Sequence, residues 1–591
     1  MKKKFAGLLA FLALTALFSA VIFAGGCDGN KENAADMVLY GNVVTMDEDN
    51  PLCEAVVVKN GTIVFAGSKD EAEKYISAKT SSIDYGDNFI YPGFVDGHSH
   101  IGLMATLLCN GLQLRAEDPL IENAAKMKEF IEKNPGKEVY KGFGFWYLSD
   151  GKDKGTSLDH SIFDRASTTV PIVCIDGGGH SALLNKAAIK HFKLKELIPI
   201  YNKDGCDGIK VDADGEPTGY VVETPRFDIV ESLPISKEDL KQYILDNQED
   251  YISRGYTTIC EAGILETEAL PMVSAYKELA QEKKLKLKIR ALCQISETTK
   301  DPLKEVERII SLAKQCNDEY FKITGVKIFI DGVPEALTSW TNNPYTASAG
   351  KGDNYYGYKR WTDSNKDTFI EIVRKANKNG LLVHAHAMGE GAVHYVTDCF
   401  AEARKGMPDE DCRNGFAHVS FIEDEDMNRL KDNKISVFLA PQWAAWKDDT
   451  KGDETKIYGE DKAKQMYKIK SFIDKGVTAS FHTDGAGTVP KMIYCAVTRN
   501  YTDKTLHPEV RGENEKVSPN EALKCLSVVP AYTMKEQDNF GCIKKGMRAD
   551  LVVYDTDFTK DSVVSSPDCT NAKLLSVFSS GKHIDLSETD K

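Results

Sequence analysis

Five apolar runs of this chain end in histidine or other polar side chains, and this recurrence restricts the fold more than any other feature. The runs read "FVDGHSH", "GVKIFIDG", "LLVHAHAMG", "GFAHVSF" and "FHTDGAG". Amphipathic segments such as "KDTFIEIVRKANKNG" and "AVHYVTDCFAEARKGM" stand between them. Short apolar runs that alternate with helical patterns predict βα units and a parallel sheet. Because every polar tip lies at the carboxyl end of a strand, where barrel active sites lie, we expect a (β/α)₈ TIM barrel.

The spacing of the tips predicts where the barrel is interrupted. A barrel of about 250 residues gives roughly 30 residues to each βα unit. His386 to His418 fits one unit and His418 to Asp484 fits two. The distance from His100 to Lys327 is much too long for three units. We therefore expect a barrel over residues 93–529 with an insertion at about 110–250.

Both ends of the chain carry a different pattern, rich in β-branched residues and broken by Gly and Asn. "DMVLYGNVVTMD" and "EAVVVKNGTIVFAG" stand near the start, and "RADLVVYDTDF" and "KLLSVFSSGKHIDL" near the end. Such runs are typical of strands. We expect residues 36–92 and 530–591 to combine into a small composite β-sandwich beside the barrel.

The first residues indicate export. "MKKK" precedes a long apolar stretch and small residues before Cys27, as in a secretory signal. The run resembles a bacterial lipoprotein signal, which would make residues 1–26 a signal peptide, Cys27 a lipidation site and residues 27–35 a tether. An uncleaved membrane-spanning helix is the alternative reading. The expected location is extracytoplasmic, on the cell membrane through a lipid anchor. A formal net charge of −15 argues against a nucleic-acid partner.

The polar tips together predict a metal site. Six of the twelve histidines lie in them. Side chains alternate along a strand, so His98 and His100 point to the same side. Imidazole and carboxylate ligands suit divalent ions, zinc first among them, and the lack of thiolates favours a catalytic site over a structural one. We expect one or two divalent metal ions at the tips.

The same motifs carry a family resemblance over about residues 36–590. "PGFVDGHSH", "GVKIFIDG", "HAMGE", "AHVSFI" and "HTDG" resemble, in this order, strand motifs of the amidohydrolase superfamily. "GCIKKGMRADLVVYD" resembles the closing signature of its family 3 branch, which includes N-substituted formamide deformylase-like proteins, and "GGGHSALLNKAAI" and "DADGEPTGYVVE" resemble that branch's insertion.

The resemblance implies a role for each tip. His98 and His100 would bind the more buried metal, and His386 and His418 a second metal. Lys327 would bridge the two ions if its amine is carboxylated. Asp484 would ligate metal and act as the general base that takes a proton and passes it to the leaving nitrogen.

Several assignments stay open from the residues alone. His384 shares the inward face with His386, so either could be the ligand, and the other would lie behind it or contact substrate. Lys327 could instead pair with a carboxylate such as Asp331, leaving a mononuclear site. Further candidates for contact with substrate, each with a structural role as the alternative, are His180, Trp340, Tyr345, Glu223 and His482.

The predicted activity is hydrolysis of a non-peptide C–N bond, in an amide, formamide or cyclic amide, by metal-activated hydroxide. The expected partner is a small-molecule amide, and the oligomeric state is not predicted. Two alternatives remain. The chain could be an extracytoplasmic solute-binding lipoprotein without turnover, or an esterase, lactonase or phosphoesterase on the same scaffold.

Overall fold

A computed structural model describes residues 34–147, 151–203, 206–407, 411–446, 454–501 and 510–586. The expected signal peptide, Cys27 and most of the tether lie outside these ranges, so export and lipidation stay predictions. Within the described ranges, no helix combines the length and the hydropathy needed to cross a membrane.

Eight parallel strands form the central sheet, which runs in the order β18-β17-β16-β15-β14-β13-β12-β5. The last strand returns to the first, where the Asp484 amide donates a hydrogen bond to the His98 carbonyl (3.2 Å). The side chains of the eight strands are largely buried, as expected for strands covered on both faces. The predicted barrel is confirmed. Its strands are β5 (Phe94–Ser99), β12 (Tyr256–Ile264), β13 (Lys288–Gln294), β14 (Phe321–Phe329), β15 (Leu382–Ala387), β16 (Gly415–His418), β17 (Ser436–Leu439) and β18 (Ala479–Phe481).

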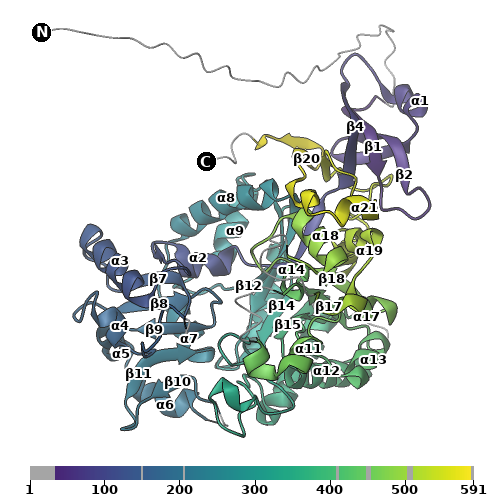
Figure 1. Cartoon of the computed structure of the whole chain (residues 1–591). Helices are drawn as coiled ribbons and strands as arrows, with labels where there is room; N and C mark the ends of the chain where they lie inside the picture. The colour runs from purple at the N-terminus through teal and green to yellow at the C-terminus, as the bar shows by residue number, and fades with distance from the viewer. Residues whose placement is uncertain are drawn as a thin grey trace, which may run out of the picture.

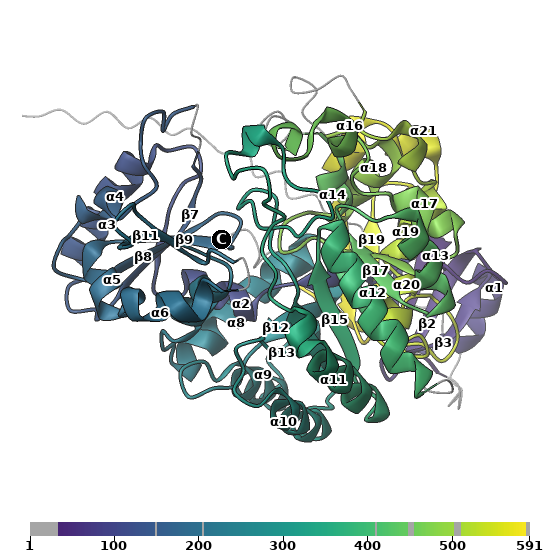
Figure 2. The ribbon, with the colours of Figure 1, turned by 90° about the horizontal axis from the view of Figure 1, so that it is seen from below.

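Amphipathic helices cover the outside of this sheet (Figure 2). One of them, α10, begins where the Asp301 side chain accepts a hydrogen bond from the Lys304 amide, and it buries Val306, Ile309 and Ile310 at helical spacing. The larger helices around the barrel are α8 (Lys237–Ser253), α9 (Met272–Gln281), α10 (Pro302–Gln315), α11 (Lys366–Lys378), α12 (Glu390–Lys405), α13 (Asp424–Asp432) and α18 (Val489–Thr498).

The expected insertion is confirmed as a separate lobe between β5 and β12 (Figures 1 and 2). Its six-stranded sheet has the order β10-β11-β9-β8-β7-β6. The strands are β6 (Leu112–Gln113), β7 (Tyr140–Phe145), β8 (Ile172–Asp176), β9 (Ser181–Leu184), β10 (Ile209–Val211) and β11 (Pro217–Val222). Its helices include α2 (Gly102–Leu108), α3 (Leu120–Lys133), α5 (Lys186–His191), α6 (Leu194–Tyr201) and α7 (Thr224–Glu231).

The two β-rich ends of the chain, for which we predicted a composite β-sandwich, combine into an additional β-sheet. Its seven strands are hydrogen-bonded into one sheet of order β21-β20-β19-β4-β1-β2-β3, and the antiparallel β4–β19 pair joins the two ends. The strands are β1 (Met37–Val44), β2 (Leu52–Lys59), β3 (Thr62–Gly67), β4 (Ser81–Pro92), β19 (Leu551–Tyr554), β20 (Leu574–Ser579) and β21 (Lys582–Ile584).

A buried ion pair fastens this additional sheet to the barrel. Lys288 of β13 donates hydrogen bonds to Asp550 Oδ1 (2.5 Å) and Ser579 Oγ (2.9 Å), and its side chain is fully buried. We expect Asp550→Ala to lower the free energy of unfolding by about 3–5 kcal/mol, because the Lys288 charge then stays buried without a partner. Denaturant titration measures this loss. The double variant Lys288→Met/Asp550→Leu, which removes both charges, should recover most of it; equal stability of Asp550→Ala and wild type would contradict the assigned role.

Candidate metal centre and active site

The polar tips meet at one edge of the barrel, where the parallel strands end. Each side chain is placed by the strand that carries it or that it follows. They are His98 and His100 at the end of β5, Lys327 in β14, His384 and His386 in β15, His418 at the end of β16, and His482 and Asp484 directly after β18.

One group of ligand atoms comes from His98, His100 and Asp484. The Nε2 atoms of the two histidines are 3.2 Å apart, and Asp484 Oδ1 lies 3.4 Å from His98 Nε2 and 3.2 Å from His100 Nε2. Lys327 Nζ approaches the same His98 nitrogen at 3.4 Å. Three donor atoms thus converge on a small volume, with the lysine amine beside it.

A second group comes from His418, His482 and the same Asp484. In each group the ligand atoms lie within 4.8 Å of one another. The sequence left the role of His482 open, with a packed pocket histidine as the alternative, and the structure brings it beside His418 (ring centroids 5.0 Å apart). Asp484 therefore belongs to both groups.

The chemistry of these donors fits divalent metal ions. Both ring nitrogens of His482 and Nδ1 of His418 are buried without a hydrogen-bond partner among the described residues, which is costly unless something else satisfies them. Burial lowers the pKa of His482 to about 4, and it holds the pKa of His98 and His418 well below the usual value. These imidazoles are therefore neutral at pH 7, the form that binds metal.

Asp484 and Lys327 differ from the histidines in charge. Burial favours the protonated form of Asp484, but the hydrogen bond with His100 and the nearby imidazoles hold the pKa of its carboxyl group well below the usual range. Burial lowers the pKa of the Lys327 amine to about 7. No ion pair joins Lys327 to Asp331 in the described part of the chain, since Asp331 instead accepts hydrogen bonds from the amides of Met388 and Gly389.

The two histidines of β15 occupy different positions. His384 Nε2 hydrogen-bonds with Nδ1 of His98 (2.7 Å), on the opposite side of that ring from the ligand atoms, and its own ring packs on Phe438 (centroids 4.3 Å apart). His386 Nε2 donates to the Gly332 carbonyl (3.2 Å), and its ring lies 4.6 Å from that of His418. Neither belongs to the two ligand groups found among the described residues. His384 is placed to orient His98.

Three buried carboxylates hold the loops that carry these side chains. The sequence motifs did not predict this role for them. Asp96 accepts hydrogen bonds from the His98 amide (3.3 Å) and the Thr483 amide (3.0 Å), which ties β5 to the turn after β18. Glu261 of β12 accepts from the amides that follow His100, and Asp331 accepts from the turn after β15. The sequence could have indicated these carboxylates by their position, because each lies in a barrel strand or shortly after its end.

Backbone strain collects at the same edge. His418 has φ 84° and Asp484 has φ 57°, both in the left-handed region that non-glycine residues avoid. Such residues cost of order 1–3 kcal/mol each and concentrate at functional sites. Trp443 stacks on the His418 ring (centroids 5.2 Å apart) and closes that side of the site, a contact for which the sequence held no local signal.

The insertion contributes His180 to the site. Its Nδ1 hydrogen-bonds with both carboxylate oxygens of Glu223 (3.1 and 2.9 Å), and its ring lies 5.3 Å from that of His386. Glu223 is fully buried with φ 57° and also accepts from Thr338 Oγ1 (2.6 Å). His180 is thus held rigidly beside the histidine cluster.

The aromatic candidates of the loop after β14 lie elsewhere. The Trp340 amide donates to Asp331 Oδ2 (2.9 Å) and its ring packs on Tyr395 (centroids 5.8 Å apart). Tyr345 donates to the Ser339 carbonyl (2.5 Å). Neither side chain has a described contact with the ligand groups. Their contacts instead stabilise the loop that follows β14.

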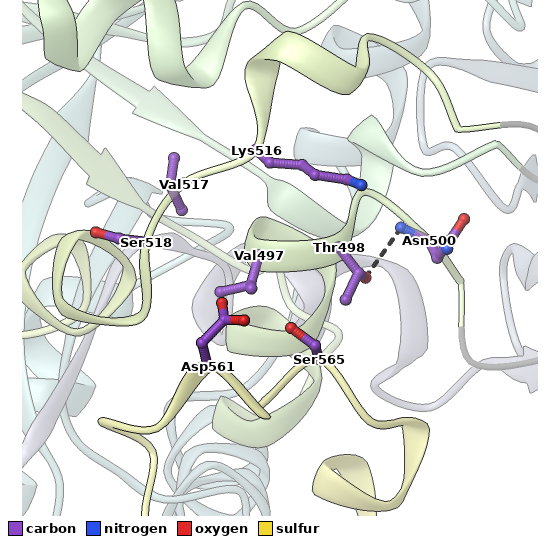
Figure 3. Close-up of a pocket in the computed structure, with 8 residues that line it drawn as sticks. All are labelled: Val497, Thr498, Asn500, Lys516, Val517, Ser518, Asp561 and Ser565. Carbon is purple, nitrogen blue, oxygen red and sulfur yellow. Dashed lines mark hydrogen bonds between the residues drawn. The ribbon is translucent and has the colours of Figure 1, made fainter. Parts of the chain in front are cut away.

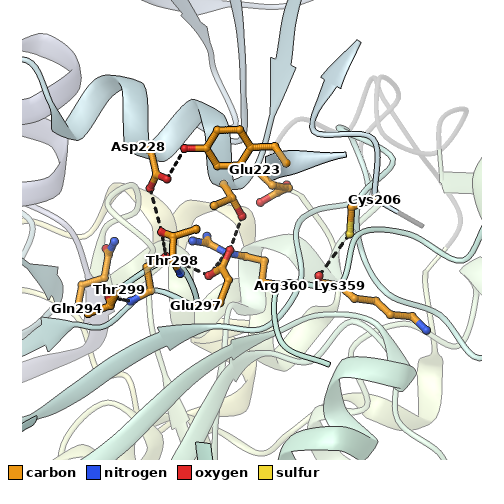
Figure 4. Close-up of polar contacts among 12 residues, drawn as sticks. Cys206, Glu223, Asp228, Gln294, Glu297, Thr298, Thr299, Lys359 and Arg360 are labelled. Atoms are coloured by element: carbon orange, nitrogen blue, oxygen red, sulfur yellow. Dashed lines mark hydrogen bonds and ion pairs between the residues drawn. The ribbon is translucent and has the colours of Figure 1, made fainter. Parts of the chain in front are cut away.

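A polar seam joins the insertion to the barrel beside the site (Figure 4). Arg360 donates from Nε to both oxygens of Glu297 (3.2 and 3.1 Å), and its guanidinium lies over the rings of Phe227 and Phe329. Thr224, at the start of α7, donates to the same Glu297. The seam fixes the insertion, and with it His180, against the barrel.

A cavity of about 550 Å³ lies elsewhere, between α18 and α21 (Asp561–Val564) (Figure 3). Its lining includes Thr498, Lys516, Asp561 and Ser565, and none of the histidines that the structure describes. Size alone does not mark an active site, and this cavity lacks the convergent donors found at the barrel edge.

Comparisons with known proteins agree with this architecture. The model of the amidohydrolase family matches residues 82–581. The exoenzymes regulatory protein AepA of Pectobacterium carotovorum subsp. carotovorum is 25% identical over 74% of this chain and 91% of its own length. The N-substituted formamide deformylase of Arthrobacter pascens is 22% identical over 88% of this chain and 93% of its own.

The fold has solved counterparts as well. An uncharacterized metal-dependent hydrolase from Pyrococcus horikoshii OT3 is similar with a TM-score of 0.67 and 20% identity, over 89% of this chain and 99% of its own. The resemblance expected from the strand motifs is confirmed by the family match, which spans most of the sequence. The chain belongs to the amidohydrolase family and is a hydrolase of that family.

Proposed function

We propose that this protein is a metal-dependent hydrolase of small molecules that cleaves a non-peptide C–N bond in an amide, formamide or cyclic amide. The observation that carries the proposal is the pair of ligand groups that share Asp484 at the carboxyl edge of the barrel. His98, His100, His418, His482 and Asp484 would hold one or two divalent ions, with zinc the best fit to imidazole and carboxylate donors.

The residues of the site divide the work of hydrolysis. A bound divalent ion lowers the pKa of water to near neutrality and polarises a carbonyl group. The ionised Asp484 carboxylate accepts the proton of the attacking water and passes it to the leaving nitrogen, as a general base and then a general acid. His384 fixes the ring of His98 through their 2.7 Å hydrogen bond.

Lys327 would complete the donor set in a carboxylated form. Its amine is buried, has a pKa near 7, and forms no ion pair with a described carboxylate. A neutral amine adds to CO₂ and loses a proton, which gives an anionic carbamate. That group could face both ligand groups from β14, where an ammonium could not serve as a ligand.

The choice of a C–N bond rests on family membership and on the similarity to the Arthrobacter formamide deformylase along 88% of the chain. Cleavage of a C–N bond also needs a proton donor, because the amine must be protonated to leave. Asp484 could supply the proton that it has taken from water.

Metal removal and a substrate panel test the proposal. We expect the purified protein to hydrolyse N-substituted formamides or cyclic amides, to lose that activity after chelation, and to recover it with Zn²⁺. Matched esters, lactones and phosphoesters serve as controls for the reacting bond. Faster turnover of these controls would replace the C–N assignment, and tight binding without turnover of any amide would favour a solute-binding role.

A further inference from the structure

Four apolar side chains pack together at the edge of the barrel that carries the metal ligands, and we call them the apolar rim. They are Val333 and Ala336 in the loop after β14, Met388 directly after β15, and Trp443 in α14 (Pro441–Ala444), which follows β17. The first three are buried, whereas Trp443 is partly exposed. An aromatic side chain thus stays partly uncovered among the strand ends that form the site.

Trp443 contacts both histidines of the second ligand group. Its ring stacks on that of His418 (centroids 5.2 Å apart, planes 28° apart) and meets that of His482 edge to face (5.6 Å, 89°). Because both histidines would hold metal, a substrate carbonyl bound there lies beside the Trp443 ring. A substituent next to that carbonyl would then lie against the apolar rim.

Hydrogen bonds fix the apolar rim from behind. Gln442, the neighbour of Trp443, donates from Nε2 to the Thr483 carbonyl (3.0 Å), which ties the turn after β17 to the turn after β18. The Met388 amide donates to Asp331 Oδ1 (3.0 Å). A surface that is ordered before a ligand arrives loses little entropy on binding, so it can discriminate between substituents.

The apolar rim continues into a cavity of about 270 Å³ between the insertion and the loop after β14, which we call the insertion pocket. Ala336 belongs to both. The lining also includes four aromatic side chains of the insertion, Phe145, Trp146, Tyr147 and Tyr220. A cavity of this size is smaller than a site for a whole drug-sized ligand and suits one ring-sized substituent.

The charged groups of the insertion pocket do not require a charged occupant. Asp176 is buried, and the positive groups of Arg226 and His180 act on it. Glu335 is exposed to solvent. Lys351 Nζ lies 3.7 Å from a carboxylate that does not line the pocket. An uncharged group therefore meets no buried charge that lacks compensation.

We propose that Trp443 is a specificity-determining residue, and that the apolar rim and the insertion pocket together select an uncharged aromatic substituent next to the scissile bond. This inference rests on the proposed function for the reaction, but not for the binding of the ring. An aromatic substituent gains apolar burial at the rim and a ring–ring contact with Trp443. A methyl group in the same position would gain little of either.

Direct binding tests the apolar rim without turnover. Benzohydroxamic acid and acetohydroxamic acid carry the same metal-binding group and differ in a ring against a methyl group. We expect calorimetry with the metal-loaded full chain to show at least about 10-fold tighter binding of benzohydroxamate, because it adds ring burial and a ring–ring contact. Trp443→Ala should reduce this ratio to below about 3-fold, and Trp443→Phe, which keeps a ring, should retain most of it.

A purely structural role of Trp443 would change the affinity for both probes by the same factor. The acetohydroxamate affinity and the metal content of each variant therefore report on the His418 contact alone. Trp340→Phe is the matched control, because Trp340 packs on Tyr395 without a described contact to the ligand groups, and both affinities should match wild type. Equal affinity of wild type for the two probes, or an unchanged ratio in Trp443→Ala, would overturn the proposal.

The charge of the substituent has its own comparison. 4-Methylbenzohydroxamic acid and its 4-aminomethyl analogue are similar in size, and only the second carries a cation near neutral pH. We expect the uncharged probe to bind tighter, because the ammonium group must leave water for a pocket whose charges are already compensated. Tighter binding of the cation would overturn the selection of an uncharged group.

Turnover separates this inference from the proposed function. The aryl member of each amide pair should show a higher kcat/KM than the methyl member, and Trp443→Ala should lower mainly the former. Hydrolysis of both members at equal kcat/KM would reject the selective rim and keep the hydrolase. Selective benzohydroxamate binding without hydrolysis of any amide would keep the rim and reject the proposed reaction.

Discussion

Asp484→Asn is expected to lower kcat by about 10²–10⁴-fold, the usual contribution of a positioned general base. The amide keeps the size of the side chain and one oxygen toward His98 and His100, but it cannot accept the proton of the attacking water. KM should change little, because the substrate pocket is untouched. Steady-state kinetics with the best substrate of the panel measures both values.

Because Asp484 belongs to both ligand groups, its replacement could also reduce metal content. Activity should therefore be expressed per bound ion, with metal measured by elemental analysis of the same sample. Asp214→Asn, at an exposed turn of the insertion, is the matched control and should keep full activity. Full activity of Asp484→Asn with intact metal would show that another group is the base.

Lys327→Ala is expected to lower the metal content from about two ions per chain to one or none, and activity should fall with it. A carbamate would supply oxygens to both ions of a two-metal site, so its removal should weaken both. Elemental analysis after metal-replete purification measures the content. Ions retained at the wild-type number would leave Lys327 with a structural role.

Lys322→Ala is the control on the same strand. Lys322 lies near the start of β14 and pairs with Glu536 (2.8 Å), away from the ligand groups. The metal content of the Lys322→Ala protein should therefore match that of wild type. One ion in both wild type and Lys327→Ala would indicate a mononuclear site. No metal in either protein would overturn the proposed function itself.

Much of the fold was readable because it depends on local pattern. Strand tips ending in "HSH" or "HAH" and the helices after them follow from periodicity, and their order along the chain predicts neighbouring parallel strands. The long gap between His100 and Lys327 predicted the insertion, which the structure places between β5 and β12. The chain ends were readable as strands for the same reason.

The arrangement of side chains inside the site was harder to predict from the sequence. Alternation places both His384 and His386 on the inward face, but the ring directions depend on Phe438 and on the Gly332 carbonyl, which come from other strands. The link between Asp96 and Thr483 joins residues 387 positions apart. No local pattern specifies such a contact, although Asp96 stood in a motif already singled out.

The sequence by itself determined which residue types stand at the carboxyl ends of the strands, because side-chain alternation and strand–helix order are properties of short segments. Only the tertiary structure decided which nitrogens converge on Asp484, and that His180 arrives beside them from the insertion. The physical reason is that barrel closure and docking of the insertion set distances between distant segments, and these distances arise from the packing of the whole chain.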